Sequence, residues 1–200
     1  VVIAVPVQAT EAVLREIGEA LGETCVLTDV GSVKGSFVQA VSAVFGNVGP
    51  FVIPGHPIAG SEKSGVAASS STLFQHHKVI LTPSSNTDPL AFSRLRALWE
   101  GCGATVLDMS VERHDEVLAA TSHLPHLLAF SLVDTLAGDD DNKDIFRYAA
   151  GGFRDFTRIA ASDPVMWHDI FLANRESVLR ALDHFTTDLG KLRAAIVAAD

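Results

Sequence analysis

His56 is the residue of this chain whose type and surroundings best suit chemistry at neutral pH. It lies in FVIPGHPIAGSEKSG, residues 51–65, where an apolar run ends in Gly55 and Pro57 follows the histidine. This pattern predicts a loop at the carboxyl end of a strand, where open α/β sheets place their active sites. An imidazole titrates near neutral pH, so His56 is a candidate for taking a proton from a substrate hydroxyl. Since a histidine in such a loop also serves to cap a strand, the segment alone does not decide between the two roles.

Ser32 lies in a second polar segment, TDVGSVKG, residues 28–35. It follows an expected strand and a glycine and precedes an expected helix, so its hydroxyl is suited to cap that helix. Of the charged residues beside it, Asp29 is expected to be structural and Lys34 to be solvated at the start of the helix.

A third segment, SHLPH, places Ser122 and His126 four residues apart. On a helix they share one face, and Pro125 between them would kink the helix and free backbone carbonyl groups. His123 would point elsewhere and is expected to be structural. The pair at the kink is either the wall of a site or a satisfied polar network inside a core.

Arg158 lies in the fourth segment, GGFRDFTRIAASDPVMW, residues 151–167. A planar guanidinium binds a carboxylate through two hydrogen bonds, so Arg158 is a candidate for holding an anionic substrate. The alternative is a surface ion pair of little energetic weight.

Short apolar runs rich in β-branched residues alternate with helical patterns in the first half of the chain. The expected strands are residues 1–5, 25–30, 51–54, 78–82 and 104–108, and the expected helices are residues 9–21, 33–45 and 88–100. This alternation predicts an α/β fold with a mostly parallel sheet that positions the first two polar segments.

The pattern changes near Ser110, and no strand is expected after Met109. Ser110 is a plausible cap for a helix over residues 111–137, and residues 138–142 form an acidic loop. Ser162-Asp163-Pro164 predicts an N-cap, here assigned to Ser162, with proline in the first turn of a long helix that continues through Leu182. A last helix is expected over residues 188–199. The second half is therefore predicted to be entirely helical.

Composition limits the class of partner. The net charge of −9 argues against nucleic acid, because phosphate contacts need clustered lysine and arginine. Apolar residues make up 48% of the chain, which suggests an oligomer interface or a face left bare by a missing segment. Cys25 and Cys102 match no metal or redox spacing and are expected to be reduced thiols. With no signal peptide and no run approaching the roughly 20 apolar residues of a membrane span, a cytoplasmic protein is expected.

The four polar segments together resemble the prephenate dehydrogenase family, which includes the arogenate and cyclohexadienyl dehydrogenases of tyrosine biosynthesis. The resemblance keeps the family's motif order over nearly the whole chain. It implies a truncated Rossmann-type dinucleotide-binding domain at residues 1–109 and an all-α substrate and dimerisation domain at residues 110–200. The family begins with a Gly-rich dinucleotide loop, and no G-x-G-x-x-G occurs here. The chain is therefore expected to be a fragment that binds dinucleotide poorly and is inactive by itself.

The resemblance implies oxidative decarboxylation of prephenate to 4-hydroxyphenylpyruvate with hydride transfer to NAD, and NADP is not excluded. Arogenate, which would give tyrosine directly, is the alternative substrate, and a homodimer is the implied assembly. His56 would accept the proton of the C4 hydroxyl as hydride leaves C4, and Ser32 would orient its imidazole near the nicotinamide. Substrate contacts are implied for Arg158, ahead of Arg154 and Arg147, and for His126, Ser122 and Trp167. Cofactor contacts are implied for Val5, Pro6, Ser32 and Gly60.

Two competing functions come from the residues themselves. His114 and Asp115, with His56, His123 and His126, suggest a metal-dependent hydrolase. Against it, His114 and Asp115 are adjacent rather than spaced as H-x-x-x-H, and a hydrolase leaves GSVKG and FTRIAASDP unexplained. The other alternative is that the 200-residue chain serves only to dimerise through its helical half.

Overall fold

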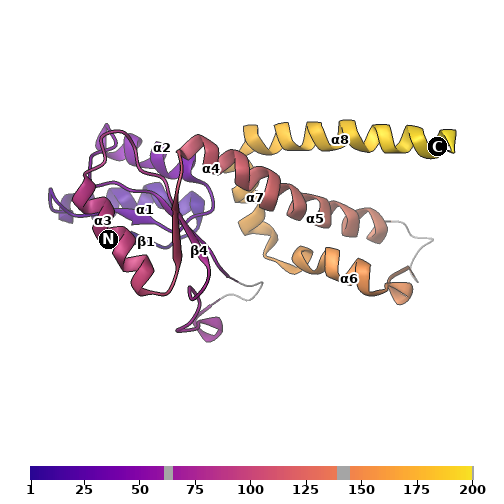
Figure 1. The fold of residues 1–200 in the computed structure, drawn as a ribbon, viewed down its shortest axis with the longest axis horizontal. Coiled ribbons are helices and arrows are strands. Elements are labelled where there is room, and N and C mark those ends of the chain that lie inside the picture. Colours follow the sequence, from indigo (N-terminus) through magenta and orange to yellow (C-terminus); the bar gives the residue numbers. More distant parts are fainter. Residues whose placement is uncertain (61–64, 139–144, 200) are drawn as a thin grey trace.

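The computed structural model describes residues 1–60, 65–138 and 145–199, with an α/β half followed by a helical half (Figure 1). The first half contains β1 (Val2–Ile3), β2 (Thr28–Asp29), β3 (Gly55–Ile58), β4 (Lys78–Leu81), β5 (Thr105–Asp108), α1 (Thr10–Ile17), α2 (Lys34–Phe45) and α3 (Pro89–Gly101). Short 3-10 turns are η1 (Val7–Ala9), η2 (Gly18–Ala20) and η3 (Val66–Ala68). The α/β class is as the sequence predicts.

The sheet is mixed, whereas the sequence predicts a mostly parallel one. β1 pairs with β2 in parallel, and Leu27 forms a parallel bridge to Val52. β3 then runs antiparallel to β4, and β4 pairs with β5 in parallel. Residues 51–58 are therefore one extended run that borders β2 with its first part and β4 with its second.

This extended run shows that the expected position of His56 in a loop is wrong. His56 and Pro57 lie within β3, opposite Ile80 and Val79 of β4. A proline, which has no amide hydrogen, is tolerated in an edge strand, and β3 is the edge of its three-stranded sheet. The histidine is consequently fixed by a backbone ladder, which holds its side chain more firmly than a loop would.

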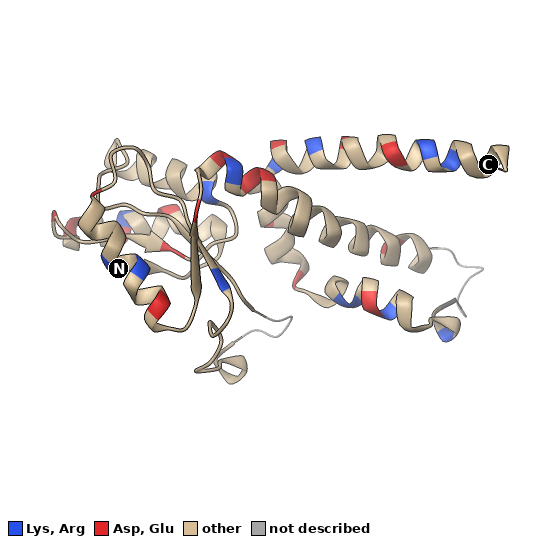
Figure 2. Ribbon diagram, viewed as in Figure 1, with Lys and Arg blue, Asp and Glu red and all other residues tan. Residues whose placement is uncertain are grey.

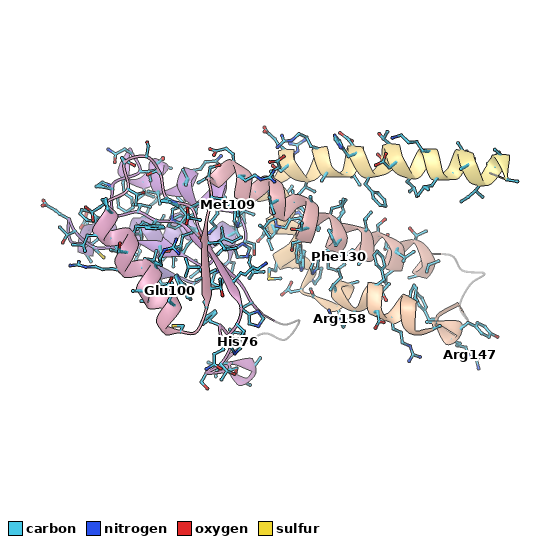
Figure 3. The ribbon with its side chains drawn as sticks, in the orientation of Figure 1. His76, Glu100, Met109, Phe130, Arg147 and Arg158 are labelled. Carbon is cyan, nitrogen blue, oxygen red and sulfur yellow. The ribbon has the colours of Figure 1, made fainter. Side chains whose placement is uncertain are left out.

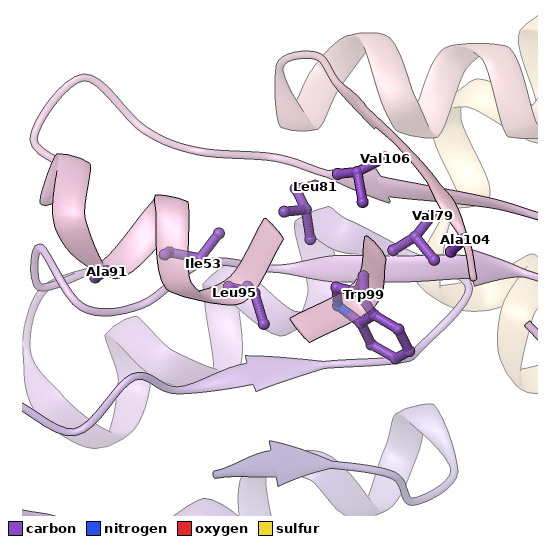
Figure 4. Close-up of a cluster of buried hydrophobic side chains, with 8 residues drawn as sticks. All are labelled: Ile53, Val79, Leu81, Ala91, Leu95, Trp99, Ala104 and Val106. Carbon is purple, nitrogen blue, oxygen red and sulfur yellow. The ribbon is translucent and has the colours of Figure 1, made fainter. Parts of the chain in front are cut away.

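Apolar residues pack on both faces of the sheet. Val52 and Ile53 are adjacent in the extended run, so their side chains point to opposite faces. On one side, α1 and α2 pack against the sheet, and the core there consists of Ile3, Leu14, Leu27, Phe37, Ala40, Val41 and Val52. On the other side α3 packs against the sheet, and the core consists of Ile53, Val79, Leu81, Ala91, Leu95, Trp99, Ala104 and Val106 (Figure 4). These two cores hold the strands whose ends carry the polar segments.

The second half consists of helices that extend away from the sheet (Figure 1). They are α4 (Val111–Leu118), the π-turn η4 (Ala119–His123), α5 (Leu124–Ala137), η6 (Ile145–Tyr148), α6 (Gly151–Thr157), η7 (Arg158–Ala161), α7 (Pro164–Ala173) and α8 (Arg175–Ala198). The first three are continuous, as predicted for residues 111–137. The expected kink at Pro125 takes the form of the π-turn just before it, a common way to admit a proline into a helix.

Helix boundaries in this half differ from the prediction at two places. The cap of α7 is Asp163, whose Oδ1 accepts hydrogen bonds from Val165 N at 2.8 Å and Met166 N at 3.2 Å, so the assignment of the cap to Ser162 is wrong. The predicted long helix ends at Ala173, and α8 then runs through residue 188 without a break. Ser110 caps α4 as predicted, accepting from Arg113 N at 3.1 Å. Most of the expected acidic loop at 138–142 lies outside the described residues.

The helical stretch Val111–Ala137 is long and apolar enough to cross a membrane by length and composition alone. The prediction that no apolar run approaches the length of a membrane span therefore does not hold for this stretch. Asp134 is the one charged residue of α5, which Figure 2 shows almost free of charge. The same test is passed by helices of soluble proteins, so it does not by itself distinguish a bilayer from a protein interface.

Candidate active site

A cavity of about 450 Å³ lies where the ends of β1 and β2 face α7. Because β1 and β2 are parallel, the residues that follow them meet at one edge of the sheet. The lining from this edge is Ala4, Val5, Pro6, Val7, Val30, Gly31 and Ser32, and from α7 and its cap it is Asp163, Val165, Met166, Asp169 and Ile170. The structure thus brings together Val5, Pro6 and Ser32. Gly60 does not border this cavity.

Lys34 is completely buried, so the expectation of a solvated lysine is wrong. Its ammonium forms an ion pair with Asp29 Oδ2 and donates to the carbonyl oxygen of Gly55 at 2.6 Å. Asp29 Oδ1 in turn accepts from Gly55 N at 3.1 Å. The two charged side chains therefore clamp both backbone groups of the residue that precedes His56. Burial raises the pKa of Asp29 and lowers that of Lys34, and each charge opposes the shift of the other.

His56 is buried and takes part in a chain of hydrogen bonds that leads to a carboxylate. Its Nδ1 lies 2.9 Å from Nε2 of His114, and Nδ1 of His114 lies 2.8 Å from Oδ1 of Asp115. His114 is fully buried, with 0% of its surface exposed. No hydrogen bond joins His56 to Ser32 in the described part of the chain, so the expected orienting contact from Ser32 is not seen. His114 occupies that position beside the imidazole instead.

Asp115 also caps α2 from a distance of about eighty residues in sequence. Its Oδ1 accepts from Lys34 N and its Oδ2 from Gly35 N, both at 2.8 Å. The N-cap residue of α2 is Val33, without a capping side chain, so the predicted cap by Ser32 is not formed. A Cβ at Gly35 would lie 2.8 Å from Asp115 Oδ2, which explains why a glycine is suited to this place. A carboxylate at a helix N-terminus is also favoured by the helix dipole.

Burial is the main influence on the pKa values of two histidines of the site, His56 and His123. Burial, then the charges of His114, Lys34 and His123, lower the pKa of His56 to about 2. Burial also lowers the pKa of His123 to about 4, although Asp115 opposes the shift. Burial raises the pKa of Asp115, but hydrogen bonds from His114 and the backbone of Lys34 and Gly35 outweigh it, and the net shift is downward.

The second-half residues expected at the substrate also come together. His126 stacks on Trp167 with ring centroids 3.6 Å apart, and its Nδ1 donates to the carbonyl oxygen of Ser122 at 2.9 Å. Burial and then the charge of Arg158 lower the pKa of His126, against the effect of the Ser122 bond. Arg158 lies at the end of α6 nearer the sheet, whereas Arg147 lies at the far tip (Figure 3). This favours Arg158 over Arg147, as the sequence does.

Asn174 connects these two groups of residues. Its amide nitrogen donates to the carbonyl oxygen of Asp115 at 2.7 Å and lies 3.2 Å from Nδ1 of His123. His123 packs edge-on against Trp167, with centroids 6.0 Å apart. Hydrogen bonds therefore run from His56 in β3 to His123, whose ring packs against Trp167 of α7.

Sequence reasoning missed Lys34, His114, Asp115 and Asn174 as parts of this site. Each is buried and polar, and each finds its partner across a long stretch of chain. The adjacent His114 and Asp115, just after the Ser110 cap, were the visible signal, and they suggested a metal site. Among residues 1–60, 65–138 and 145–199, no group of three or more histidine, cysteine or acidic residues is arranged to hold a metal ion.

Nearly the whole chain is similar to proteins of one family. Residues 1–108 match the family model described as prephenate dehydrogenase, nucleotide-binding domain, and residues 110–200 match prephenate dehydrogenase, dimerization domain. The chain is 43% identical to the cyclohexadienyl dehydrogenase of Zymomonas mobilis over its full length, covering 68% of that protein. It covers 54% and 55% of two further curated relatives, so it spans between about half and two thirds of their length.

Solved structures give the same picture. The prephenate dehydrogenase of A. aeolicus in complex with hydroxyphenyl propionate and NAD⁺ superposes with a TM-score of 0.90 at 43% identity, over 99% of this chain and 68% of that one. An arogenate dehydrogenase from Synechocystis superposes with a TM-score of 0.83 at 28% identity, over 99% of this chain and 71% of that one.

Proposed function

The chain belongs to the prephenate dehydrogenase family, and from this premise we propose that the polypeptide carrying it converts prephenate to 4-hydroxyphenylpyruvate. The family match supports an NAD-dependent oxidoreductase, and the family resemblance implies a place in tyrosine biosynthesis. The observation that carries the proposal is the buried imidazole of His56, hydrogen-bonded to a second buried histidine and clamped at Gly55 by Lys34 and Asp29.

His56 is proposed to accept the proton of the C4 hydroxyl while hydride leaves C4. The bond between the ring and its carboxylate breaks, carbon dioxide leaves, and the two electrons of that bond complete an aromatic ring. The proton then returns to the phenolic oxygen of the product, so His56 ends the reaction neutral. Aromatisation and loss of carbon dioxide make the step effectively irreversible.

NAD is the cofactor, and the cavity at the ends of β1 and β2 suits its nicotinamide end. When bound, the oxidised nicotinamide accepts the hydride. Val5 and Pro6 present an apolar wall for a flat ring, and Ser32 presents a hydroxyl. We assign these three residues to the cofactor, and we keep Gly60 as a contact expected from the resemblance alone.

Arg158, His126 and Trp167 are proposed to hold the substrate. Prephenate carries two carboxylates, and a guanidinium binds one of them through two hydrogen bonds. Trp167 and His126 form a stacked aromatic surface suited to a six-membered ring. Ser122 supports this surface through its carbonyl bond to His126, a different role from the direct contact expected from sequence.

Arogenate is the second candidate substrate. The close superposition with an arogenate dehydrogenase favours testing it, since the two substrates differ by a keto group against an ammonium group. Both reactions use the same ring chemistry, so His56 serves either one. Comparing kcat/KM for the two compounds in the full-length protein decides between them.

The deciding test of the function is a His56→Asn variant of the full-length protein. We expect kcat to fall by roughly 10²- to 10⁴-fold, the usual contribution of a general base, with KM for the substrate kept. His184→Asn, an exposed histidine on α8, is the matched control and keeps its turnover. Wild-type protein that reduces NAD with neither prephenate nor arogenate would refute the function. Full turnover in His56→Asn would refute the role of the histidine.

We further propose a cytoplasmic homodimer that binds neither nucleic acid nor membrane. The net charge of −9 disfavours phosphate partners. The apolar helix Val111–Ala137 lies inside the segment that matches the dimerization domain, so a partner subunit is the better explanation of its apolar surface.

A further inference from the structure

We propose that His114 and Asp115 are positioning residues that fix the tautomer of His56 and so leave its Nε2 lone pair available to act as the base. This inference rests on the proposed function only for the role of His56. The tautomer itself follows from hydrogen-bond geometry and is measurable without substrate.

The Asp115 carboxylate accepts hydrogen bonds on both of its oxygens. Backbone amides only donate hydrogen bonds, and they contact both carboxylate oxygens, from Lys34 N and Gly35 N at 2.8 Å. Both oxygens are therefore acceptors, as in an ionised carboxylate, and the lowered pKa of Asp115 agrees with that state. His114 Nδ1, 2.8 Å from Oδ1, must then carry the hydrogen of that bond.

The hydrogen bond to Asp115 also fixes the role of the other ring nitrogen of His114. Its ring is fully buried, which disfavours a charged imidazole, and an uncharged imidazole carries only one hydrogen. With that hydrogen on Nδ1, Nε2 of His114 is an acceptor. His56 Nδ1, 2.9 Å away, must therefore donate, which leaves Nε2 of His56 without a hydrogen. A base needs its lone pair on the nitrogen that meets the substrate, and this chain specifies it.

The residues of this hydrogen-bonded chain come from both halves of the molecule. His56 lies in β3 and Lys34 begins α2, both in the sheet half, while His114 and Asp115 lie on α4, the first helix of the other half. The base thus takes its working tautomer only when α4 docks on the start of α2. The Asp115 carboxylate both caps α2 and accepts the hydrogen bond from His114. The docking of α4 and the tautomer of His56 are therefore coupled.

The tautomer is measured by ¹⁵N NMR of the full-length protein labelled at histidine, with the His56 signals assigned through the His56→Asn variant. We expect a hydrogen on Nδ1 of His56 and none on Nε2 at neutral pH. A hydrogen on Nε2 of His56, alone or together with Nδ1, overturns the proposal. The tautomer itself is read in unaltered protein, and the variant serves only to assign the His56 signals.

Two substitutions at His114 separate orientation from packing. His114→Gln offers an amide oxygen near the position of Nε2 that accepts from His56, whereas His114→Phe fills the space without an acceptor. We expect kcat to fall about 10- to 100-fold in His114→Phe, as for other groups that orient a working histidine, with KM little changed. In His114→Gln most of that loss should be restored, and His56 should keep its Nδ1 hydrogen.

Equal losses in the two variants, or an unchanged His56 tautomer in His114→Phe, overturn the proposal. His184→Gln is the control for the loss of a histidine elsewhere. If wild-type protein turns over neither substrate but shows the expected tautomer, the proposed function fails and this inference stands. If turnover is normal and the tautomer is the other one, the inference fails and the function stands.

Discussion

His56 is proposed to act as a base, although its surroundings give it a low proton affinity. Burial and neighbouring charges hold its pKa at about 2, whereas a general base works best with a pKa near the working pH. The proposed substrate, with its two carboxylates, would bring negative charge close to His56. We therefore expect the proton affinity of His56 to rise when that substrate binds.

The low pKa values of His56 and His123 predict that stability falls in mild acid. Unfolded histidines bind protons near pH 6.5, but the folded ones do so near pH 2 and pH 4. Below about pH 6.5 the unfolded state binds more protons, so the free energy of unfolding decreases as pH falls, by at most about 1.4 kcal/mol per pH unit for each histidine. The contribution of His123 levels off near pH 4, and that of His56 continues below it.

Urea unfolding between about pH 7 and pH 5 measures this slope. His76→Gln, at an exposed position of the sheet half, is the control for removal of a histidine elsewhere in the chain. A stability that stays flat or rises across this range contradicts the prediction.

The buried Lys34 predicts a large cost for a single substitution and a smaller one for a paired change. Lys34→Met leaves the Asp29 carboxylate buried without its counter-ion and should destabilise the protein by about 3–5 kcal/mol. The double variant Lys34→Met with Asp29→Asn removes both charges and should recover part of that loss. Lys191→Met, at an exposed pair on α8, should change stability by less than about 0.5 kcal/mol. Similar effects at Lys34 and Lys191 in denaturant unfolding would show that the buried pair has no special weight.

At the scale of elements, periodicity found the helices and most strands because their apolar faces are local in sequence. Residues 78–82 and 104–108 predicted β4 and β5 to within one residue. The break at Asn174 was invisible, because nothing local ends a helix there. Its side chain contacts Asp115 and His123, which lie about fifty to sixty residues earlier in the sequence. The position of His56 was misjudged for the same reason, since β3 depends on pairing with β4.

The start of α7 gives a prediction at this scale. Asp163 accepts two backbone hydrogen bonds from the first turn, so Asp163→Ala should cost about 1 kcal/mol. Ser162→Ala, one residue earlier, removes a side chain that does not cap the helix and should cost less than about half of that. Thermal or urea unfolding of the two variants tests the assignment, and a larger loss at Ser162 would reverse it.

At the scale of the whole molecule, continuous segments of the sequence supplied the candidates. His56, Ser32, His126 and Arg158, whose roles stay predictions, were proposed in this way. The residues that position His56 were not, because Asp115 and Lys34 act over eighty-one residues of chain and His114 over fifty-eight from His56. A buried charge satisfied from another domain has no local pattern, and Lys34 looks the same in sequence as a solvated lysine.

The helical half leaves more apolar surface exposed than a monomer needs. Val178 is the one buried residue of α8, although all 24 residues of that helix are described. Isolated helices are marginal in water, so a helix this exposed needs another surface to pack against. Exposed apolar side chains at the end of α7 and along α8 include Leu172, Leu179, Leu189, Leu192, Ile196 and Val197. We take this surface to be the interface of the proposed homodimer.

Ile196→Asp should therefore convert the full-length dimer to monomers at micromolar concentration. Ile196 is 78% exposed, so an aspartate there disturbs little within one protomer but places a charge among the apolar side chains of the proposed interface. Val66→Asp, at a residue 91% exposed in the sheet half, is the matched control and should leave the dimer intact. Sedimentation measures the mass, and circular dichroism measures whether α8 frays once its partner is lost. A dimer that survives Ile196→Asp with unchanged affinity would place the interface elsewhere, and the exposure of α8 would then need another explanation.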